Sequence, residues 1–596
     1  MVRRASGLVV PESSIAQRHP IDLVSLVITS SDVGLGASTL EEVAREMSRC
    51  PLAGTVTALT GLMARLRERG ADHKRIDLDF ARAALTEELL AEVVSRIERG
   101  DRLVTEHSVL KLIEYALRHC YTGNHVVPRV EYLAWMMLVL NDHLGVGDDA
   151  DDAAPDLGLY IDGEPVARAS TLAADTVANQ YFHAEVDLPS LIARFQRRWR
   201  EMPADDLSAG CGIDLDGIYL TTVGVPFEDL VTVATMVWGM SAQGSVVLKT
   251  AEMCRALSWD AERLDSVLEL MARDPAEMVA AIDQDEYSGT WSFNAFERFP
   301  ILRLDAETVV AVNPDYVLCR AYGWLPLFDI ATALEHAASI GGEKARGDVP
   351  PMSAITNYLR ANTERYALEV LESIAPRRGP FKRLWDELEL QAAYPGKQAK
   401  KVCDAVLEEP GAWVAVEVSS RSVQRKLASA ASPQALLDDV LRGVVDKAKQ
   451  LEATLTRLRE DESRLTGRAA EQGRRFVPIL LISEGFPLGP VTRAVINDRL
   501  RRSNVLQNEQ SQPLHIIGMH ELELLEHAVT TGRGSLVDLL DAHARSTMAQ
   551  MNLRDFLVGY LGGHHRPARQ VRLWEKALAA TTARMKAHRE GETDDQ

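Results

Sequence analysis

The strongest constraint on the fold lies in residues 403–421, CDAVLEEPGAWVAVEVSSR, where two apolar segments flank Pro410-Gly411. Side chains alternate between the two faces of a strand, so Asp404 and Glu417 each share a face with apolar residues. A hairpin centred on this turn places Asp404 directly opposite Glu417. Opposed residues in an antiparallel pair have Cβ atoms about 4.5 to 5.5 Å apart. We therefore expect two adjacent carboxylates on a largely apolar sheet.

Two carboxylates this close repel each other, so either one stays protonated or a cation lies between them. A hard divalent ion such as Mg²⁺ suits the pair, because it binds carboxylate oxygens and keeps water ligands for chemistry. A three-residue turn or a bulge would shift the register by one residue and separate the two side chains. Strand carboxylates that face solvent are the alternative interpretation.

The elements around this hairpin predict an α/β sheet covered by helices on both faces. A helix, ITNYLRANTERYALEVLESI, precedes strands near 388–394 and 401–408, and the strand WVAVEVSS follows them. A long charged helix is then expected over about 433–468. The last predicted elements are the strand FVPILLIS, a helix near 490–502, the strand LHIIGM and the helix HELELLEHAV.

The first part of the chain is predicted to be helical. After a cap at Ser38, with Glu41 three residues on, apolar residues recur at three- and four-residue spacing through the segment YLAWMMLVL. The aspartate-rich stretch 145–158 lacks the spacing of a calcium loop and is interpreted as a linker. Residues 340–351 form a second candidate linker, and Asn313 is expected to cap a helix that follows a short hairpin.

The predicted fold class is therefore α+β and multidomain. We expect an acidic helical domain over 1–150, a mixed, mostly helical domain with a short hairpin over 158–345, a sheet domain over 350–565 and a helical tail over 566–596.

Charge is distributed unevenly between these parts. Residues 1–344 hold 30 Lys+Arg against 53 Asp+Glu, a net charge of -23, whereas the remainder holds 36 against 33, a net charge of +3. The acidic part is unsuited to general nucleic-acid binding, while a local basic face is possible in the C-terminal part. Six scattered cysteines predict neither a disulfide framework nor a zinc site. We see no signal peptide and no run of about 18 apolar residues, and expect a cytoplasmic protein without membrane association.

The C-terminal pattern resembles the nuclease core of the PD-(D/E)xK, or restriction-endonuclease-like, superfamily. The resemblance covers roughly residues 355–530 and rests on four short segments. They are Glu364-Arg365-Tyr366 on the first helix, Asp404, Glu417-Val418-Ser419, and Lys447-Ala448-Lys449-Gln450-Leu451 on the long helix.

The resemblance implies a restriction-endonuclease-like fold and hydrolysis of DNA phosphodiesters with Mg²⁺ or Mn²⁺, by an endonuclease of restriction or anti-phage defence type. It implies Asp404, Glu417 and the Val418 backbone carbonyl as metal ligands, with Glu364 as a further ligand and Gln450 as a substrate contact. Ser419 stands where the family has its catalytic lysine. Either a lysine from another element replaces it, with Lys449 as the first candidate before Lys447, Lys401 and Lys426, or the chemistry has been lost.

Two functions thus remain open from the sequence. The first is a Mg²⁺-dependent DNA endonuclease. The second is a catalytically degenerate nuclease fold that serves as a scaffold, while the acidic helical half binds a basic protein partner. A lysine ammonium within about 4 Å of the carboxylate pair would favour the enzyme.

Overall fold

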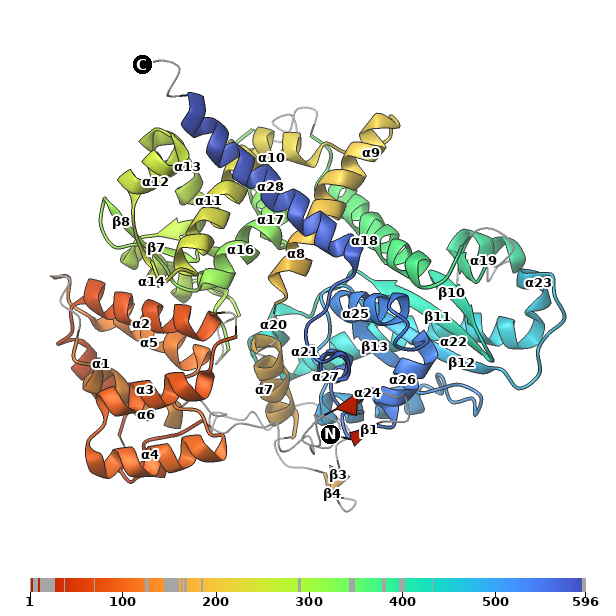
Figure 1. Cartoon of the computed structure of the whole chain (residues 1–596), viewed down its shortest axis with the longest axis horizontal. Helices are drawn as coiled ribbons and strands as arrows, with labels where there is room; N and C mark the ends of the chain where they lie inside the picture. The colour runs from red at the N-terminus through yellow and green to blue at the C-terminus, as the bar shows by residue number, and fades with distance from the viewer. Residues whose placement is uncertain are drawn as a thin grey trace.

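The computed structural model of the chain mixes helices with two small sheets, as the sequence predicts (Figure 1). It describes residues 2–3, 9–10, 27–36, 38–68, 70–123, 128–143, 160–161, 164–165, 169–183, 186–287, 291–341, 349–377, 382–395, 402–430 and 432–591. The candidate linker 145–158 lies wholly outside these ranges, and the candidate linker 340–351 lies partly outside them. Two pairs of two-residue strands, β1 (Val2–Arg3) with β2 (Val9–Val10) and β3 (Tyr160–Ile161) with β4 (Glu164–Pro165), complete the strand inventory outside the two sheets.

The N-terminal part is helical. Its elements are η3 (Ser31–Val33), α1 (Leu40–Met47), α2 (Leu52–Arg67), α3 (His73–Ala84), α4 (Glu87–Arg99), α5 (Glu106–His119) and α6 (Val130–Asp142). The first α-helix is capped by Thr39, whose hydroxyl and the Glu42 carboxylate form a capping box. The cap predicted at Ser38 with Glu41 is therefore wrong by one residue. The cluster of apolar side chains inside these helices also includes Phe296, Leu302 and Val310, which come from the next part of the chain.

The middle part surrounds a four-stranded sheet of order β5-β8-β7-β6, formed by β5 (Val247–Lys249), β6 (Ala272–Arg273), β7 (Ile301–Arg303) and β8 (Thr308–Ala311). The predicted hairpin is the antiparallel pair β7–β8, and the Asn313 side chain caps the following helix as expected. The helices are α7 (Ala169–Phe182), α8 (Leu188–Phe195), η4 (Gln196–Glu201), α9 (Met202–Ser208), α10 (Leu215–Val223), α11 (Phe227–Ser241), α12 (Thr250–Leu257), α13 (Ala261–Met271), α14 (Pro275–Asp283), α15 (Asn294–Arg298), α16 (Pro314–Tyr322) and α17 (Leu325–Gly341).

The C-terminal part is built on a five-stranded sheet of order β13-β12-β11-β10-β9. Its strands are β9 (Leu384–Asp386), β10 (Ala405–Glu409), β11 (Ala412–Ser419), β12 (Arg475–Ile482) and β13 (His515–Gly518). The pairs β9–β10 and β10–β11 are antiparallel, whereas β11–β12 and β12–β13 are parallel. Every residue of β10 and β11 is buried, because helices cover both faces of the sheet.

The helices of this part are α18 (Met352–Ile374), α19 (Glu387–Ala393), α20 (Arg425–Ala428), α21 (Pro433–Asp439), η7 (Val440–Val445), α22 (Asp446–Asp461), α23 (Ser463–Thr466), α24 (Pro490–Arg502), α25 (Met519–Thr530), α26 (Leu536–Ala544), α27 (Leu553–Leu561) and α28 (Ala568–Gly591). One face of the sheet, with Val414 and Val416, packs on α18 and α25 to α27. The opposite face, with Trp413 and Ala415, packs on α21, α22 and α24. Figure 1 shows the sheet between these two helical layers.

One predicted strand is wrong. Residues 387–393 form α19, not a strand, because Asp386 ends β9 and caps the helix in a capping box with Glu389. The segment ELELQAA alternates like a strand, but its residues are good helix formers, and Leu388 faces solvent.

The packing also crosses the domain boundaries suggested by the sequence. Three side chains of α7, Ala173, Ala174 and Val177, lie in the apolar cluster on the α22 face of the sheet. The C-terminal helix α28 runs back along α8 and α11, where Ala577 joins the middle cluster (Figure 1).

No single helix among the described residues is long and apolar enough to cross a membrane. Two pairs of consecutive helices, α10–α11 and α16–α17, reach the length and apolar composition of a membrane span only when both helices of the pair are counted together, and each pair is bent at its break.

Candidate active site

The hairpin β10–β11 brings Asp404 and Glu417 together. Ala405 lies opposite Val416, and extending this register by one residue places Asp404 opposite Glu417. The predicted register is therefore confirmed. Asp404 stands just before β10, and its Oδ2 accepts a hydrogen bond of 2.6 Å from the Val418 amide. The carboxylate thus occupies the place that a continuing strand would take beside Val418.

Glu417 lies on the face of the sheet that α22 covers, and only 2% of the residue is exposed. Its Oε1 accepts a hydrogen bond of 2.6 Å from the Nζ of Lys447, in the first turn of α22. Its Oε2 is buried and has no hydrogen-bond partner among the described residues. A buried carboxylate oxygen without a partner carries a large desolvation cost, and such an atom suits a cation or a water as ligand.

Burial raises the pKa values of both carboxyl groups. Burial raises the pKa of Glu417 to about 8, the Asp404 charge adds to this shift and Lys447 opposes it. Burial likewise raises the pKa of Asp404 to about 6, against the Val418 amide and Lys447. The pKa of Lys447 is raised, because attraction to Glu417 outweighs the effect of burial. One cation thus faces two carboxylates that it does not fully compensate.

Two further carboxylates lie within electrostatic range. Burial raises the pKa of Glu364 on α18, and repulsion by Asp404 is the next cause. The charge of Glu387, at the start of α19, also raises the pKa values of Asp404 and Glu417. Sequence reasoning missed Glu387 because its segment was assigned to a strand. The Asp386-x-x-Glu389 capping pattern was the signal that could have placed it at a helix start.

The remaining predicted residues lie in other positions. Lys449 is paired with Asp446 at 2.7 Å and more than half exposed, so Lys447, not Lys449, lies beside Glu417. Ser419 is buried, its hydroxyl accepts from the Arg421 amide, and it contributes no charge. Gln450 is half-buried, and its backbone carbonyl accepts from the Thr454 hydroxyl. Lys426 lies over the Tyr287 ring, and Lys401 lies outside the described residues.

The helix pattern explains why Lys447 is the lysine at the sheet. Leu451, Leu455 and Leu458 are the buried stripe of α22 that packs on the sheet. Lys447 precedes Leu451 by four residues and therefore continues that stripe, whereas Lys449 lies on the opposite side of the helix. The π-helical turn η7 ends at Val445, two residues before Lys447. The apolar spacing was thus a signal for Lys447 that the sequence already carried.

The donor set fits a hard divalent ion in chemistry, although no three His, Cys, Asp or Glu side chains of the described residues are close enough to enclose one as they stand. The unpartnered Oε2 of Glu417 and the adjacent Asp404 supply carboxylate oxygens. The Val418 amide points to Asp404, and the carbonyl of a strand residue points to the same side as its amide. Val418 can therefore offer a third oxygen to the same place.

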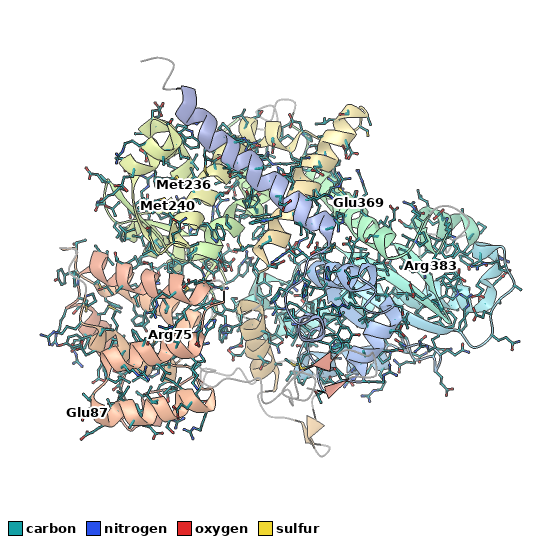
Figure 2. All side chains as sticks on the ribbon, in the orientation of Figure 1. Arg75, Glu87, Met236, Met240, Glu369 and Arg383 are labelled. Atoms are coloured by element: carbon teal, nitrogen blue, oxygen red, sulfur yellow. The ribbon has the colours of Figure 1, made fainter. Side chains whose placement is uncertain are left out.

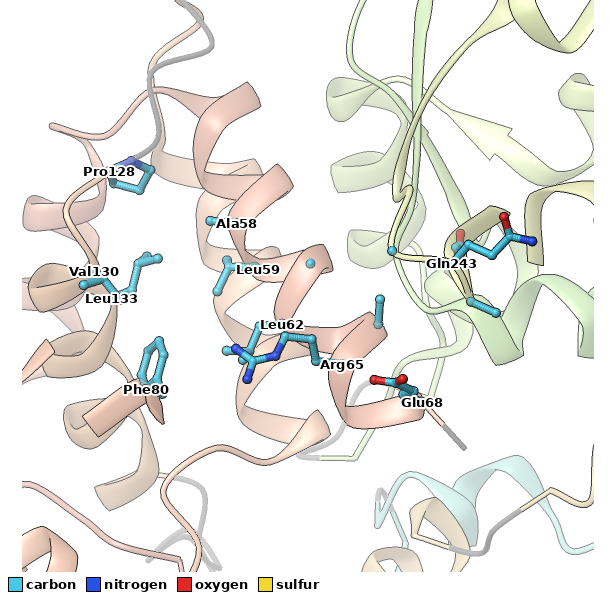
Figure 3. Close-up of a pocket in the computed structure, with 15 residues that line it drawn as sticks. Ala58, Leu59, Leu62, Arg65, Glu68, Phe80, Pro128, Val130, Leu133 and Gln243 are labelled. Atoms are coloured by element: carbon cyan, nitrogen blue, oxygen red, sulfur yellow. The ribbon is translucent and has the colours of Figure 1, made fainter. Parts of the chain in front are cut away.

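A separate cavity of about 730 Å³ lies in another region, between the N-terminal helices and the loop after α11 (Figure 3). Its walls include Leu59, Leu62, Phe80 and Leu133, and Figure 3 shows Gln243 on the far side. The polar groups there include Arg65, which is paired with Asp79. The described lining of this apolar space has no pair of buried titratable groups, which makes the carboxylate pair the stronger candidate for acid–base or metal chemistry.

Comparison of the chain with protein-family models, with curated proteins and with solved structures gave no match. Geometry and electrostatics are therefore the basis for assigning a function.

Proposed function

We propose that the protein is a metal-dependent endonuclease that hydrolyses DNA phosphodiesters at Asp404, Glu417 and Lys447. The observation that carries the proposal is the Lys447 ammonium, 2.6 Å from Glu417 and next to Asp404, while the second oxygen of Glu417 has no partner. This arrangement supplies from a helix the cation that Ser419 cannot supply from the strand.

The order of elements supports the same proposal. Helix α18, the antiparallel strands β9 to β11, the helix α21–η7–α22 and the parallel strands β12 and β13 follow one another as in the PD-(D/E)xK nuclease core that the sequence resembles. In that scheme Asp404, Glu417 and the Val418 carbonyl hold Mg²⁺ or Mn²⁺, with Glu364 as a further ligand. A bound ion would lower the pKa of a coordinated water and counter the charge that develops on the phosphate.

Lys447 is proposed to act as a cation rather than as a general base. Its pKa is raised by Glu417, so its ammonium stays protonated at neutral pH. A protonated amine can donate a hydrogen bond to a phosphate oxygen or to an attacking water, and it offsets negative charge in the transition state. Glu417, by contrast, must be ionised to bind a metal ion, which displaces its proton.

Plasmid DNA with Mg²⁺ or Mn²⁺ tests the proposal. We expect nicking or linearisation by the wild type and loss of that activity in Asp404→Ala, with Lys449→Met as a folded control that retains it. Equal cleavage by wild type and Asp404→Ala would show that the activity lies elsewhere. Intact DNA with every variant, while the protein remains folded, would favour the scaffold function, in which the acidic helical half binds a protein partner.

A further inference from the structure

Arg198 forms no ion pair among the described residues and contacts α18, the helix that carries Glu364. Its Nη2 donates to the Thr363 hydroxyl at 2.6 Å, and its Nε is buried without a partner among the described residues. No carboxylate of the described residues lies within 4.0 Å of this guanidinium. Burial lowers the pKa of Arg198, and the charge of Glu484 only partly offsets that effect. The residue as a whole is partly exposed.

Neighbouring buried arginines are all neutralised. Arg194, one turn earlier, pairs with Glu523 at 2.9 Å, and the other oxygen of Glu523 accepts from the Tyr366 hydroxyl. Arg569 pairs with Glu526 at 2.9 Å. Glu523 and Glu526 are thus already paired with other arginines. An unpaired guanidinium in such a place is costly, and an anionic ligand is one way to repay the cost.

The position of Arg198 links it to the carboxylate site. Thr363, its hydrogen-bond partner, precedes Glu364 on α18, and the Asn362 amide donates to the Arg198 carbonyl at 3.1 Å. Arg197, the preceding residue, holds Glu369 on the same helix at 2.6 Å; Figure 2 labels Glu369 on α18. Two adjacent residues therefore fix this segment against the helix that carries Glu364.

The backbone around Arg198 has an unusual feature. The described residues contain two π-helical turns, η4 and η7. One carries Arg198, which contacts Thr363 on α18, and the other ends two residues before Lys447, which contacts Glu417. π-Helical turns are rare and often occur at functional sites.

We propose that Arg198 binds a backbone phosphate of the nucleic-acid strand that enters the carboxylate site. This inference rests on the proposed function and extends it by naming a substrate-binding residue from outside the sheet. A guanidinium presents planar, paired donors to a phosphate, and contacts of this kind position the strand without reading its sequence. Arg198 would hold a phosphate next to the scissile one while Lys447 and the carboxylates act on the scissile group.

The test measures DNA binding apart from cleavage. A short fluorescent DNA duplex is titrated by anisotropy at several salt concentrations, with Ca²⁺ in place of Mg²⁺, against the wild type, Arg198→Met, Arg198→Lys and Arg365→Met. Arg365 is the matched control, because it lies on α18 but is already paired with Asp206. We expect Arg198→Met to weaken binding about tenfold and to reduce the slope of log affinity against log salt by about 1. Arg198→Lys should fall between, and Arg365→Met should match the wild type.

Unchanged affinity and salt slope in Arg198→Met would overturn the inference, as would an equal loss in Arg365→Met. Melting curves of each variant establish that the protein is folded. Should inorganic phosphate stabilise the wild type but not Arg198→Met, with DNA binding unchanged, the residue binds a free anion and the inference is wrong. Loss of binding in Arg198→Met together with absent cleavage by the wild type would leave the phosphate contact standing and count only against the nuclease.

Discussion

Two buried glutamates, Glu408 and Glu417, lie on the same face of the hairpin β10–β11 but at opposite ends of it, and their hydrogen-bond partners differ. Glu408 lies near the turn, is 7% exposed, and its two oxygens accept from Arg468 and Arg474. Glu417 lies at the other end, is 2% exposed, and has one cation for one oxygen and no partner for the other. Asp404 adds a second negative charge beside Glu417, and Glu462 and Glu471 share Arg474 with Glu408.

The difference shows which buried carboxylates are structural. Both oxygens of Glu408 are paired with arginines, and Arg474 also pairs with Glu462 and Glu471. At Glu417 one ammonium faces two carboxylates, one glutamate oxygen has no partner among the described residues, and burial is the main cause that raises the pKa values of Glu417 and Asp404. An unpartnered carboxylate oxygen, rather than burial as such, distinguishes a candidate metal site from an ordinary buried ion pair.

The largest expected effect is on cleavage. Replacing Glu417 with Gln removes a proposed metal ligand, so plasmid cleavage in Mg²⁺ should fall by at least about 100-fold. Glu408→Gln should change the rate constant less than about threefold at a temperature where it is folded, because no ligand is touched. Rate constants for nicking measure both variants. Comparable losses in the two would remove the distinction between the two ends of the hairpin.

Lys447 should matter nearly as much. Lys447→Met removes the one cation beside the carboxylates, and we expect kcat to fall by about 100-fold, within the range for a positioned proton donor or charge. Lys449→Met removes an exposed ammonium that is paired with Asp446 on the other side of the same helix, and it should leave kcat unchanged. Single-turnover cleavage at several pH values provides the measurement. A larger loss in Lys449→Met would return the role to the lysine that the sequence favoured.

Stability should move in opposite directions at the two glutamates. Glu408→Gln removes the only ion-pair partner of Arg468 among the described residues, while Arg474 keeps Glu462 and Glu471, so the substitution should cost about 1.5 to 3 kcal/mol of unfolding free energy, the range for hydrogen bonds to charged groups. Glu417→Gln removes a group that repels Asp404 and should stabilise the metal-free protein above neutral pH. Urea unfolding with EDTA provides both values. Destabilisation of similar size by both substitutions would mean that Glu417 is also a structural ion-pair partner.

Divalent ions should stabilise the protein only through the end of the hairpin that carries Glu417. A metal ion that binds the folded state at a hundred times its Kd adds about 2.7 kcal/mol to the unfolding free energy. Mn²⁺ should therefore raise the Tm of the wild type and of Glu408→Gln, but not that of Glu417→Gln. Differential scanning fluorimetry with Mn²⁺ and with EDTA makes the comparison. A shift retained in Glu417→Gln would place the ion at another site.

The smallest effect is the dependence of stability on pH. The folded pKa values of about 6 for Asp404 and about 8 for Glu417 lie above those of the unfolded chain. Their contribution is fully present at low pH and is lost as the pH rises through the folded pKa values, so the metal-free wild type should be less stable at pH about 9 than at pH about 5. Glu417→Gln should lose less over the same range. Urea unfolding at each pH measures the slope, and a wild-type slope of opposite sign contradicts the raised values.

Local patterns in the sequence were sufficient for the hairpin but not for its surroundings. The Pro410-Gly411 turn and the alternation of β11 predict the register of Asp404 and Glu417 because both act over a few residues. The segment ELELQAA fits a strand and a helix equally well, and only the Asp386 cap decides between them. Lys447 was among four candidates, and the packing of α22 on the sheet singles it out.

The partners of Glu408 could not be predicted from local sequence patterns either. Arg468 and Arg474 lie about sixty residues beyond it in the chain, in a segment whose path no local rule fixes. The sequence therefore could not distinguish a glutamate with both oxygens paired, such as Glu408, from one with an unpartnered oxygen, such as Glu417. Arg198 is a more distant case, since it reaches α18 from a helix that belongs to the middle part.

The return of α28 to the middle helices has a practical consequence for anyone who wishes to isolate the sheet. A fragment cut at residues 350 and 565 would lose Arg569, which neutralises Glu526, and the α7 side chains that cover part of the sheet. Such a fragment would expose apolar surface and leave a buried negative charge on α25 without a partner. It is therefore expected to aggregate when produced alone. A fragment that begins before α7 and extends through α28 retains these contacts. It is shorter than the full chain and is the fragment to express.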